Sequence, residues 1–200
     1  MKNILFTLAL LISFVSFGQT ADEYYKRGLS KVQLKDNYGA IADLTKAIEI
    51  DPNYTNAYLF SGLSKLDLKD YYGAIADYTK AIELNPNANA AYFYRGISKS
   101  KLKDYNGAIA DYTKEIELDP NDDNAYLNRG LSKAELKDYN GAIADYTKAI
   151  ELDPNYALAY FTRGLSKEFL GDLNGACADW KKAAELGETI AAEIVTNNCY

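Results

Sequence analysis

The chain has 200 residues and a net charge of −6, with 48% hydrophobic and 25% charged residues, two Cys and no His. These proportions are typical of a folded, soluble chain, and the negative charge argues against nucleic acid or an anionic membrane as partner, because both require a basic face. Since His is absent and two Cys cannot form a structural zinc site alone, we expect no metal site and no cofactor.

Residues 1–18 have the pattern of a secretory signal peptide. Lys2 gives a positive start, an apolar stretch follows, and small residues occupy the third and first places before the expected cut. We therefore expect cleavage after Gly18 and export of a mature domain, 19–200, to the periplasm or the medium. The alternative is a membrane anchor, but the apolar stretch is too short to favour spanning a bilayer.

From residue 21 the chain consists of five near-copies of one 34-residue unit. Each unit has an apolar stripe at helical spacing, a Lys-Asp break and a second helical stripe. In the second copy Asp70 is a good N-cap for the second helix, and Pro86 cannot continue that helix. A fixed period of this length indicates a stacked-repeat solenoid. The copies span residues 21–54, 55–88, 89–122, 123–156 and 157–190.

Five positions recur in register through the copies. They hold an aromatic (Tyr24, Tyr58, Tyr92, Tyr126, Tyr160), a Gly (Gly28, Gly62, Gly96, Gly130, Gly164), an Ala (Ala40, Ala74, Ala108, Ala142, Ala176), a second aromatic (Tyr78, Tyr112, Tyr146, Trp180) and a second Ala (Ala47, Ala81, Ala149, Ala183). Leu44 replaces the second aromatic in the first copy, and Glu115 replaces the second Ala in the third. With these residues the unit resembles the tetratricopeptide repeat. The resemblance implies an all-α, right-handed solenoid of five helix–turn–helix repeats whose first helices line the concave side.

Basic residues depart from the family pattern on the first helices. Arg precedes the Gly in every copy except the second, which has Ser61, and Lys follows three residues after the Gly in all five. Long basic stems can pack against apolar neighbours while the charge stays solvated. We predict that these Arg residues pair with second-helix aspartates rather than form a basic ligand site. The expected partners are Asp43, Asp111, Asp145 and Asp179.

Two features of the turn inside each unit concern backbone geometry. Lys35, Lys69, Lys103 and Lys137 occupy the place of Gly171 in the last copy, and a left-handed backbone there costs each Lys about 1 kcal/mol. A Gly also opens every second helix, for which the sequence alone gives no firm reason. These are Gly39, Gly73, Gly107, Gly141 and Gly175.

The C-terminal end predicts a capping helix over about residues 189–197, which gives eleven helices in the mature chain. Cys177 and Cys199 lie eleven residues on either side of Glu188, where the last turn is centred. Antiparallel packing therefore places the two Cys opposite each other, and export brings them to an oxidising compartment. We predict a Cys177–Cys199 disulfide; the alternative is two unrelated thiols.

Ten apolar residues, two per copy and four apart, form the candidate partner-binding site. If they share the concave face, they form a continuous apolar trough; the alternative is that they pack between adjacent first helices. They are Tyr25, Leu29, Leu59, Leu63, Phe93, Ile97, Leu127, Leu131, Phe161 and Leu165.

The sequence favours an exported protein-interaction scaffold that is not an enzyme and binds a protein or peptide with apolar anchors. A structural, self-associating solenoid is the alternative. A carboxylate-dependent hydrolase is a lesser one, because it requires two close carboxylates with a raised pKa in a deep cleft. The second-helix aspartates repeat in every copy, which indicates a scaffold role rather than a single catalytic site.

Overall fold

The computed structural model describes residues 20–199, so the predicted signal peptide, 1–18, lies outside the described residues. This part of the chain is all-helical and has eleven helices, as predicted. The capping helix ends at Asn198, one residue later than expected. The helices are α1 Ala21–Gln33, α2 Asn37–Ile50, α3 Thr55–Asp67, α4 Tyr71–Leu84, α5 Asn89–Lys101, α6 Tyr105–Leu118, α7 Asp123–Glu135, α8 Tyr139–Leu152, α9 Ala157–Phe169, α10 Leu173–Glu185 and α11 Thr189–Asn198.

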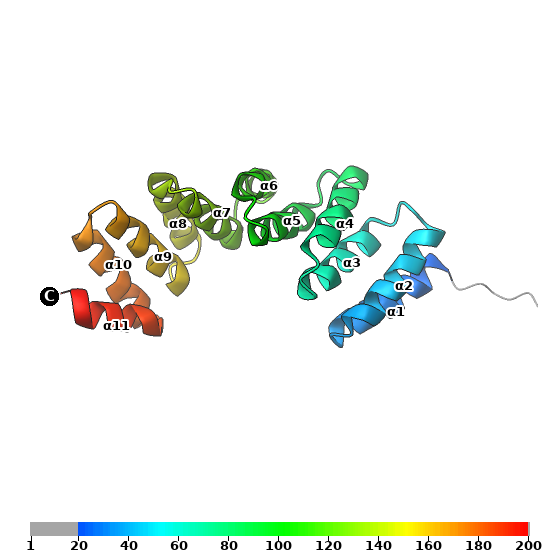
Figure 1. Ribbon diagram of the computed structural model, residues 1–200, viewed down its shortest axis with the longest axis horizontal. Helices are drawn as coiled ribbons and strands as arrows, with labels where there is room; N and C mark the ends of the chain where they lie inside the picture. Colours follow the sequence, from blue (N-terminus) through cyan, green and yellow to red (C-terminus); the bar gives the residue numbers. More distant parts are fainter. Residues whose placement is uncertain (1–19, 200) are drawn as a thin grey trace, which may run out of the picture.

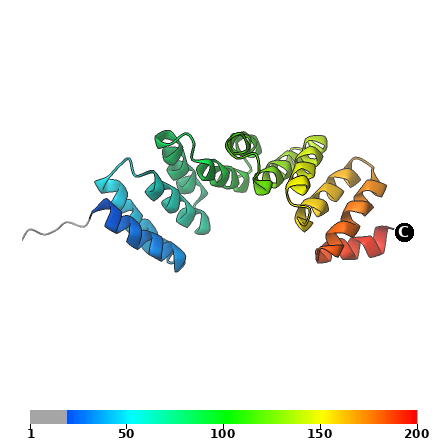
Figure 2. The same cartoon turned by 180° about the vertical axis from the view of Figure 1, so that it is seen from behind.

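The helices form antiparallel pairs that follow one another along an arch (Figures 1 and 2). Within the repeats, each first helix contacts its own second helix and the second helix of the preceding repeat, and successive first helices from α1 to α9 also contact each other. Successive second helices lack comparable contacts. Elements on the inside of a curved stack lie closer together than those outside. The first helices α1, α3, α5, α7 and α9 therefore line the concave face. No helix between residues 20 and 199 is long and apolar enough to span a membrane.

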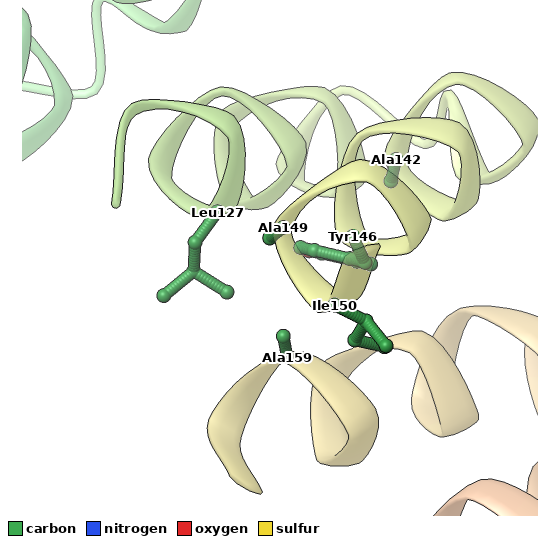
Figure 3. Close-up of a cluster of buried hydrophobic side chains, with 6 residues drawn as sticks. All are labelled: Leu127, Ala142, Tyr146, Ala149, Ile150 and Ala159. Atoms are coloured by element: carbon green, nitrogen blue, oxygen red, sulfur yellow. The ribbon is translucent and has the colours of Figure 1, made fainter. Parts of the chain in front are cut away.

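In each repeat, a large side chain of the second helix packs against the recurring Gly of the first helix and fills the space between the two helices. In the third repeat, a Cβ added at Gly96 would lie 2.7 Å from Cε1 of Tyr112, whose side chain is 1% exposed. Figure 3 shows the fourth repeat, where Tyr146 and Ala149 of α8 lie in one cluster with Ala159 of α9. The core therefore runs through the stack and joins each repeat to the next, so that no single repeat has a complete core of its own.

The Gly that opens each second helix is explained by the N-cap. Asp104 accepts a hydrogen bond from the Gly107 backbone N–H at 3.0 Å, and the other four repeats have an equivalent bond. A Cβ at Gly107 would lie 2.1 Å from the Asp104 carboxylate. Glycine therefore allows the carboxylate to reach the first-turn N–H.

The left-handed turn is confirmed. Lys35, Lys69, Lys103 and Lys137 have φ of 59°, 62°, 64° and 64°, and Gly171 and Gly187 have φ of 84° and 98°. Each Lys therefore carries a backbone strain of about 1 kcal/mol that Gly at the same position avoids.

The predicted Arg–Asp pairs are also confirmed. Arg95 donates from Nε and Nη2 to the two oxygens of Asp111 at 2.9 and 2.7 Å, and Lys99 pairs with the same carboxylate at 2.8 Å. A further N–H of Arg95 donates to Thr79 of the preceding repeat at 3.1 Å. The same bidentate arrangement joins Arg27 to Asp43, Arg129 to Asp145 and Arg163 to Asp179. Because all four guanidinium groups pair with second-helix aspartates, and three of them also bond to the preceding repeat, they do not form a basic ligand site.

The stack ends with α11, which contacts α10. Ala191 is buried against Trp180 and Ala183, and it completes the last core cluster. Cys177 of α10 and Cys199, which follows α11, lie as a bonded pair with their Cα atoms 5.6 Å apart. The geometry supports the predicted disulfide; its formation in the cell stays a prediction.

Candidate interaction face

The ten residues of the predicted trough lie on the concave first helices, and nine of them are half-buried. The exception is Leu127, which is 3% exposed and belongs to the core cluster of the fourth repeat. The other nine residues agree with both alternatives, an accessible trough and packing between adjacent first helices. Each of them packs partly against its neighbours and leaves part of its side chain accessible. Leu127 therefore fits the second alternative, packing in the core, and its part in partner binding stays a prediction.

In the first and fourth repeats, the last residue is a tyrosine that packs on the concave side of the same repeat. Tyr54 lies against Tyr25 with ring centroids 4.8 Å apart, and its hydroxyl donates to Asp22 at 3.2 Å. Tyr156 packs against the cluster that contains Leu127, and its hydroxyl donates to Asn124 at 2.8 Å. This position therefore carries a tyrosine that closes the first and fourth repeats on the concave side.

The third repeat has Asp122 in place of that tyrosine. A pocket of about 350 Å³ lies here. Its walls come from the start of α5, from α6 and from the start of α7. We call it the central pocket; it is lined by Asn89, Ala90, Phe93, Tyr94, Glu115, Asp122 and Asn124.

Glu115 is the most unusual side chain of this pocket. Glu115 occupies the position at which the other four repeats have a fully buried Ala, and it is only 1% exposed. Its Oε2 atom is buried and accepts no hydrogen bond within the described residues. Burial raises the pKa of the Glu115 carboxyl to about 8, and the negative charges of Asp122 and Asp119, together with a hydrogen bond from the protonated carboxyl to Asp122, add to the shift. A carboxyl group in this state favours a proton or a cation as its partner.

A second pocket, of about 370 Å³, lies between α7, α8 and α9. Two trough residues, Leu131 and Leu165, contribute to it. At its rim Phe169 is 67% exposed and stacks on Tyr139, with ring centroids 4.8 Å apart. We call it the C-terminal pocket. Its apolar wall suits an aliphatic or aromatic side chain.

The central pocket is the place on this face where carboxylates come together. Among the described residues, no group of three or more acidic or cysteine side chains is arranged to hold a metal ion. The central pocket holds two neighbouring carboxylates, of which one has a raised pKa, but none of its lining residues is a Lys or Arg. It thus lacks a cationic side chain to stabilise the negative charge that develops during hydrolysis.

Sequence reasoning located Phe93, Leu131 and Leu165 on this face but assigned no role to Glu115. The available signal was the break in repeat symmetry, since Glu115 and Asp122 depart together from positions that hold Ala and Tyr in the first and fourth repeats.

Comparisons with known proteins agree with this geometry. Four sequence profiles of the tetratricopeptide repeat match residues 21–54, 61–123, 124–156 and 145–178. No curated protein shows significant similarity to the chain.

Among solved structures, the crystal structure of MamA protein is 28% identical, covers 88% of this chain and 96% of its own, and has a TM-score of 0.80. MamA from Desulfovibrio magneticus RS-1 is 23% identical and covers 84% of this chain and 96% of its own, with a TM-score of 0.80. YrrB, described as a TPR protein with an unusual peptide-binding site, is 21% identical and covers 88% of this chain and 92% of its own, with a TM-score of 0.79.

Proposed function

Because the chain belongs to the tetratricopeptide repeat family, we propose that it is a non-catalytic interaction scaffold that binds a protein or peptide along its concave face. The observation that carries this proposal is the row of half-buried apolar residues on successive first helices, interrupted by two pockets. A partner segment with bulky apolar anchors fits this surface, because anchors seated in pockets supply most of the affinity of an interface. YrrB, a similar solenoid, is described as having a peptide-binding site.

Self-association is the alternative function. Exposed apolar side chains at the C-terminal end of the arch favour it, since a second copy can cover them. These are Leu136, Phe169, Leu170 and Leu173, which are 43%, 67%, 47% and 46% exposed. Light scattering of the mature chain distinguishes the two functions, because a stable dimer that hides the C-terminal pocket supports the structural alternative.

We further propose that the scaffold acts after export and that no part of it remains in the membrane. The support is the signal-like pattern of residues 1–18. Mass spectrometry of the protein purified from its natural source should give a mature N-terminus at Gln19 in the soluble fraction. Recovery of chains that retain residues 1–18 in the membrane pellet contradicts this proposal.

Replacing Phe93 with Glu should abolish capture of the partner, and Phe93→Ala should weaken it. Phe93 lines the central pocket in the middle repeat, where an aromatic is the expected hot spot; Phe93→Ala removes this aromatic surface, and Phe93→Glu in addition places a carboxylate that is costly to bury beneath a partner. The measurement is quantitative affinity capture from an envelope extract, with wild type and both variants in parallel.

The matched control for this experiment is Tyr72→Glu. Tyr72 is 77% exposed on α4, so the same charge is added away from the pockets. Circular dichroism must first show that all variants are folded, because Phe93 also contacts Tyr94 and Tyr112. If folded Phe93→Glu captures the same proteins at wild-type levels, the concave face is not the binding surface.

A further inference from the structure

We propose that the central pocket binds an arginine side chain of the partner, whose guanidinium group pairs with the carboxylates of Glu115 and Asp122. The inference rests on the proposed scaffold function and adds the chemical class of one anchor. It follows from three features of the pocket: its size, its unpaired carboxylate oxygen and its aromatic wall.

The size of the pocket corresponds to a missing side chain of this chain itself. Tyr54 and Tyr156 fill the equivalent space in the first and fourth repeats, and each hydroxyl reaches a polar residue 32 positions earlier. In the third repeat the tyrosine is replaced by Asp122, and the residue 32 positions earlier is Ala90. The space is therefore suited to a long, flat side chain that enters from outside.

The charge of the pocket selects a cation. The buried Oε2 of Glu115 has no hydrogen-bond donor in the described chain. Asp122 uses Oδ1 to cap α7, accepting from the N–H groups of Asn124 and Ala125 at 2.9 and 3.3 Å. Asp119 adds a third negative charge, and Lys and Arg are absent from the lining residues. A guanidinium group satisfies such a carboxylate better than an ammonium group, because it donates in a fixed, planar fork.

The aromatic wall adds a second contact. Phe93 and Tyr94 both line the pocket, and their rings lie edge to face with centroids 5.3 Å apart. Guanidinium groups stack favourably on aromatic faces, and the described residues include four such contacts. In these contacts Arg27, Arg95, Arg129 and Arg163 lie over Tyr24, Tyr92, Tyr126 and Tyr160 at 4.8–5.5 Å.

Arginine entry also explains why a buried carboxyl group is present where the other four repeats have Ala. The charged groups that face Glu115 are Asp119 and Asp122, which disfavour its ionisation, and a bound guanidinium reverses that effect. Binding should therefore release a proton from Glu115 near neutral pH and become tighter as the pH rises.

The test uses Nα-acetyl-arginine amide as the probe and the uncharged, isosteric Nα-acetyl-citrulline amide as its control. Backbone amide NMR of the ¹⁵N-labelled mature chain at pH 8.5 should show saturable shifts at Ala90, Phe93 and Asn124 with the arginine probe alone. At pH 6.0 the affinity should fall about tenfold or more, because Glu115 is then protonated. Equal shifts with both probes, or no saturable shift with either, overturn the proposal.

Substitutions of Glu115 test whether its carboxylate is responsible for binding the arginine probe. Glu115→Ala and Glu115→Gln should each weaken the arginine probe about tenfold or more, as expected for loss of one partner of a buried charge pair. Glu117→Ala is the matched control, since Glu117 lies on the same helix in an exposed pair with Lys114 at 2.9 Å. Unchanged binding in Glu115→Ala overturns the proposal.

The outcome also separates this proposal from the scaffold function. If the arginine probe fails but Phe93→Glu still loses its captured partner, the concave face remains the binding face and the cation pocket alone is wrong. If the probe binds as expected and capture is unaffected by Phe93→Glu, the central pocket binds a guanidinium group, but the captured partner does not bind along the concave face.

Discussion

Replacing Gly96 with leucine should lower the free energy of unfolding by about 1–3 kcal/mol. Gly96 of α5 faces the ring of Tyr112, and even a Cβ atom there would lie 2.7 Å from Cε1, so a larger side chain must displace the ring. Leucine has a higher helix propensity than glycine by about 0.8 kcal/mol, so a net loss shows that packing dominates. Chemical denaturation followed by circular dichroism measures the change.

A second substitution provides the control for this prediction. Tyr112→Ala in the Gly96→Leu background should recover part of the loss, because the new leucine fills the space that the ring leaves. The two substitutions should therefore be non-additive, as expected for residues in contact. The first repeat shows that an aliphatic residue can occupy this crossing, since Leu44 packs on Gly28. A Gly96→Leu variant as stable as wild type would mean that the helix crossing is wrongly placed.

Removing the disulfide should cost about 3 kcal/mol in the chain-entropy model, given the sequence separation of 22 residues between Cys177 and Cys199. The variant to test is the double substitution Cys177→Ser/Cys199→Ser. The loss should be concentrated in α11, which has α10 as its main neighbour, so amide hydrogen exchange should speed up most over residues 189–198.

The matched control for this prediction is wild type with a reducing agent. Reduction should reproduce the loss in wild type and leave the double variant unchanged. Mass analysis of non-reduced digests identifies the bond directly. Free thiols at both positions in protein isolated from its natural compartment would contradict the predicted disulfide.

Much of the fold could be predicted because the signals lie within each repeat. Helical stripes, the Asp N-caps and the Pro after most second helices determine where helices start and end. The Gly96–Tyr112 contact and the Arg95–Asp111 pair join positions that recur in register, so the repeat itself indicates which residues meet.

The central pocket could not be predicted in the same way, because it depends on a side chain that is missing. Phe93 is accessible since Asp122 cannot cover it, whereas Leu127 is buried in a cluster against which Tyr156 packs. Both residues occupy the same position of the repeat, so periodicity alone gives them the same environment. Only the structure shows how Asp122 and Tyr156, at the ends of the third and fourth repeats, differ in what they cover.

Site-specific photo-crosslinking tests the proposed binding face most directly. A photoreactive amino acid is placed at Asn89 and Phe169, exposed at the rims of the two pockets, and at Tyr38 and Tyr72, exposed on α2 and α4. Irradiation in the natural host should give the same crosslinked partner from Asn89 and Phe169, and none from Tyr38 or Tyr72. Crosslinks to that partner from Tyr38 and Tyr72, with none from the pocket rims, would contradict binding on the concave face.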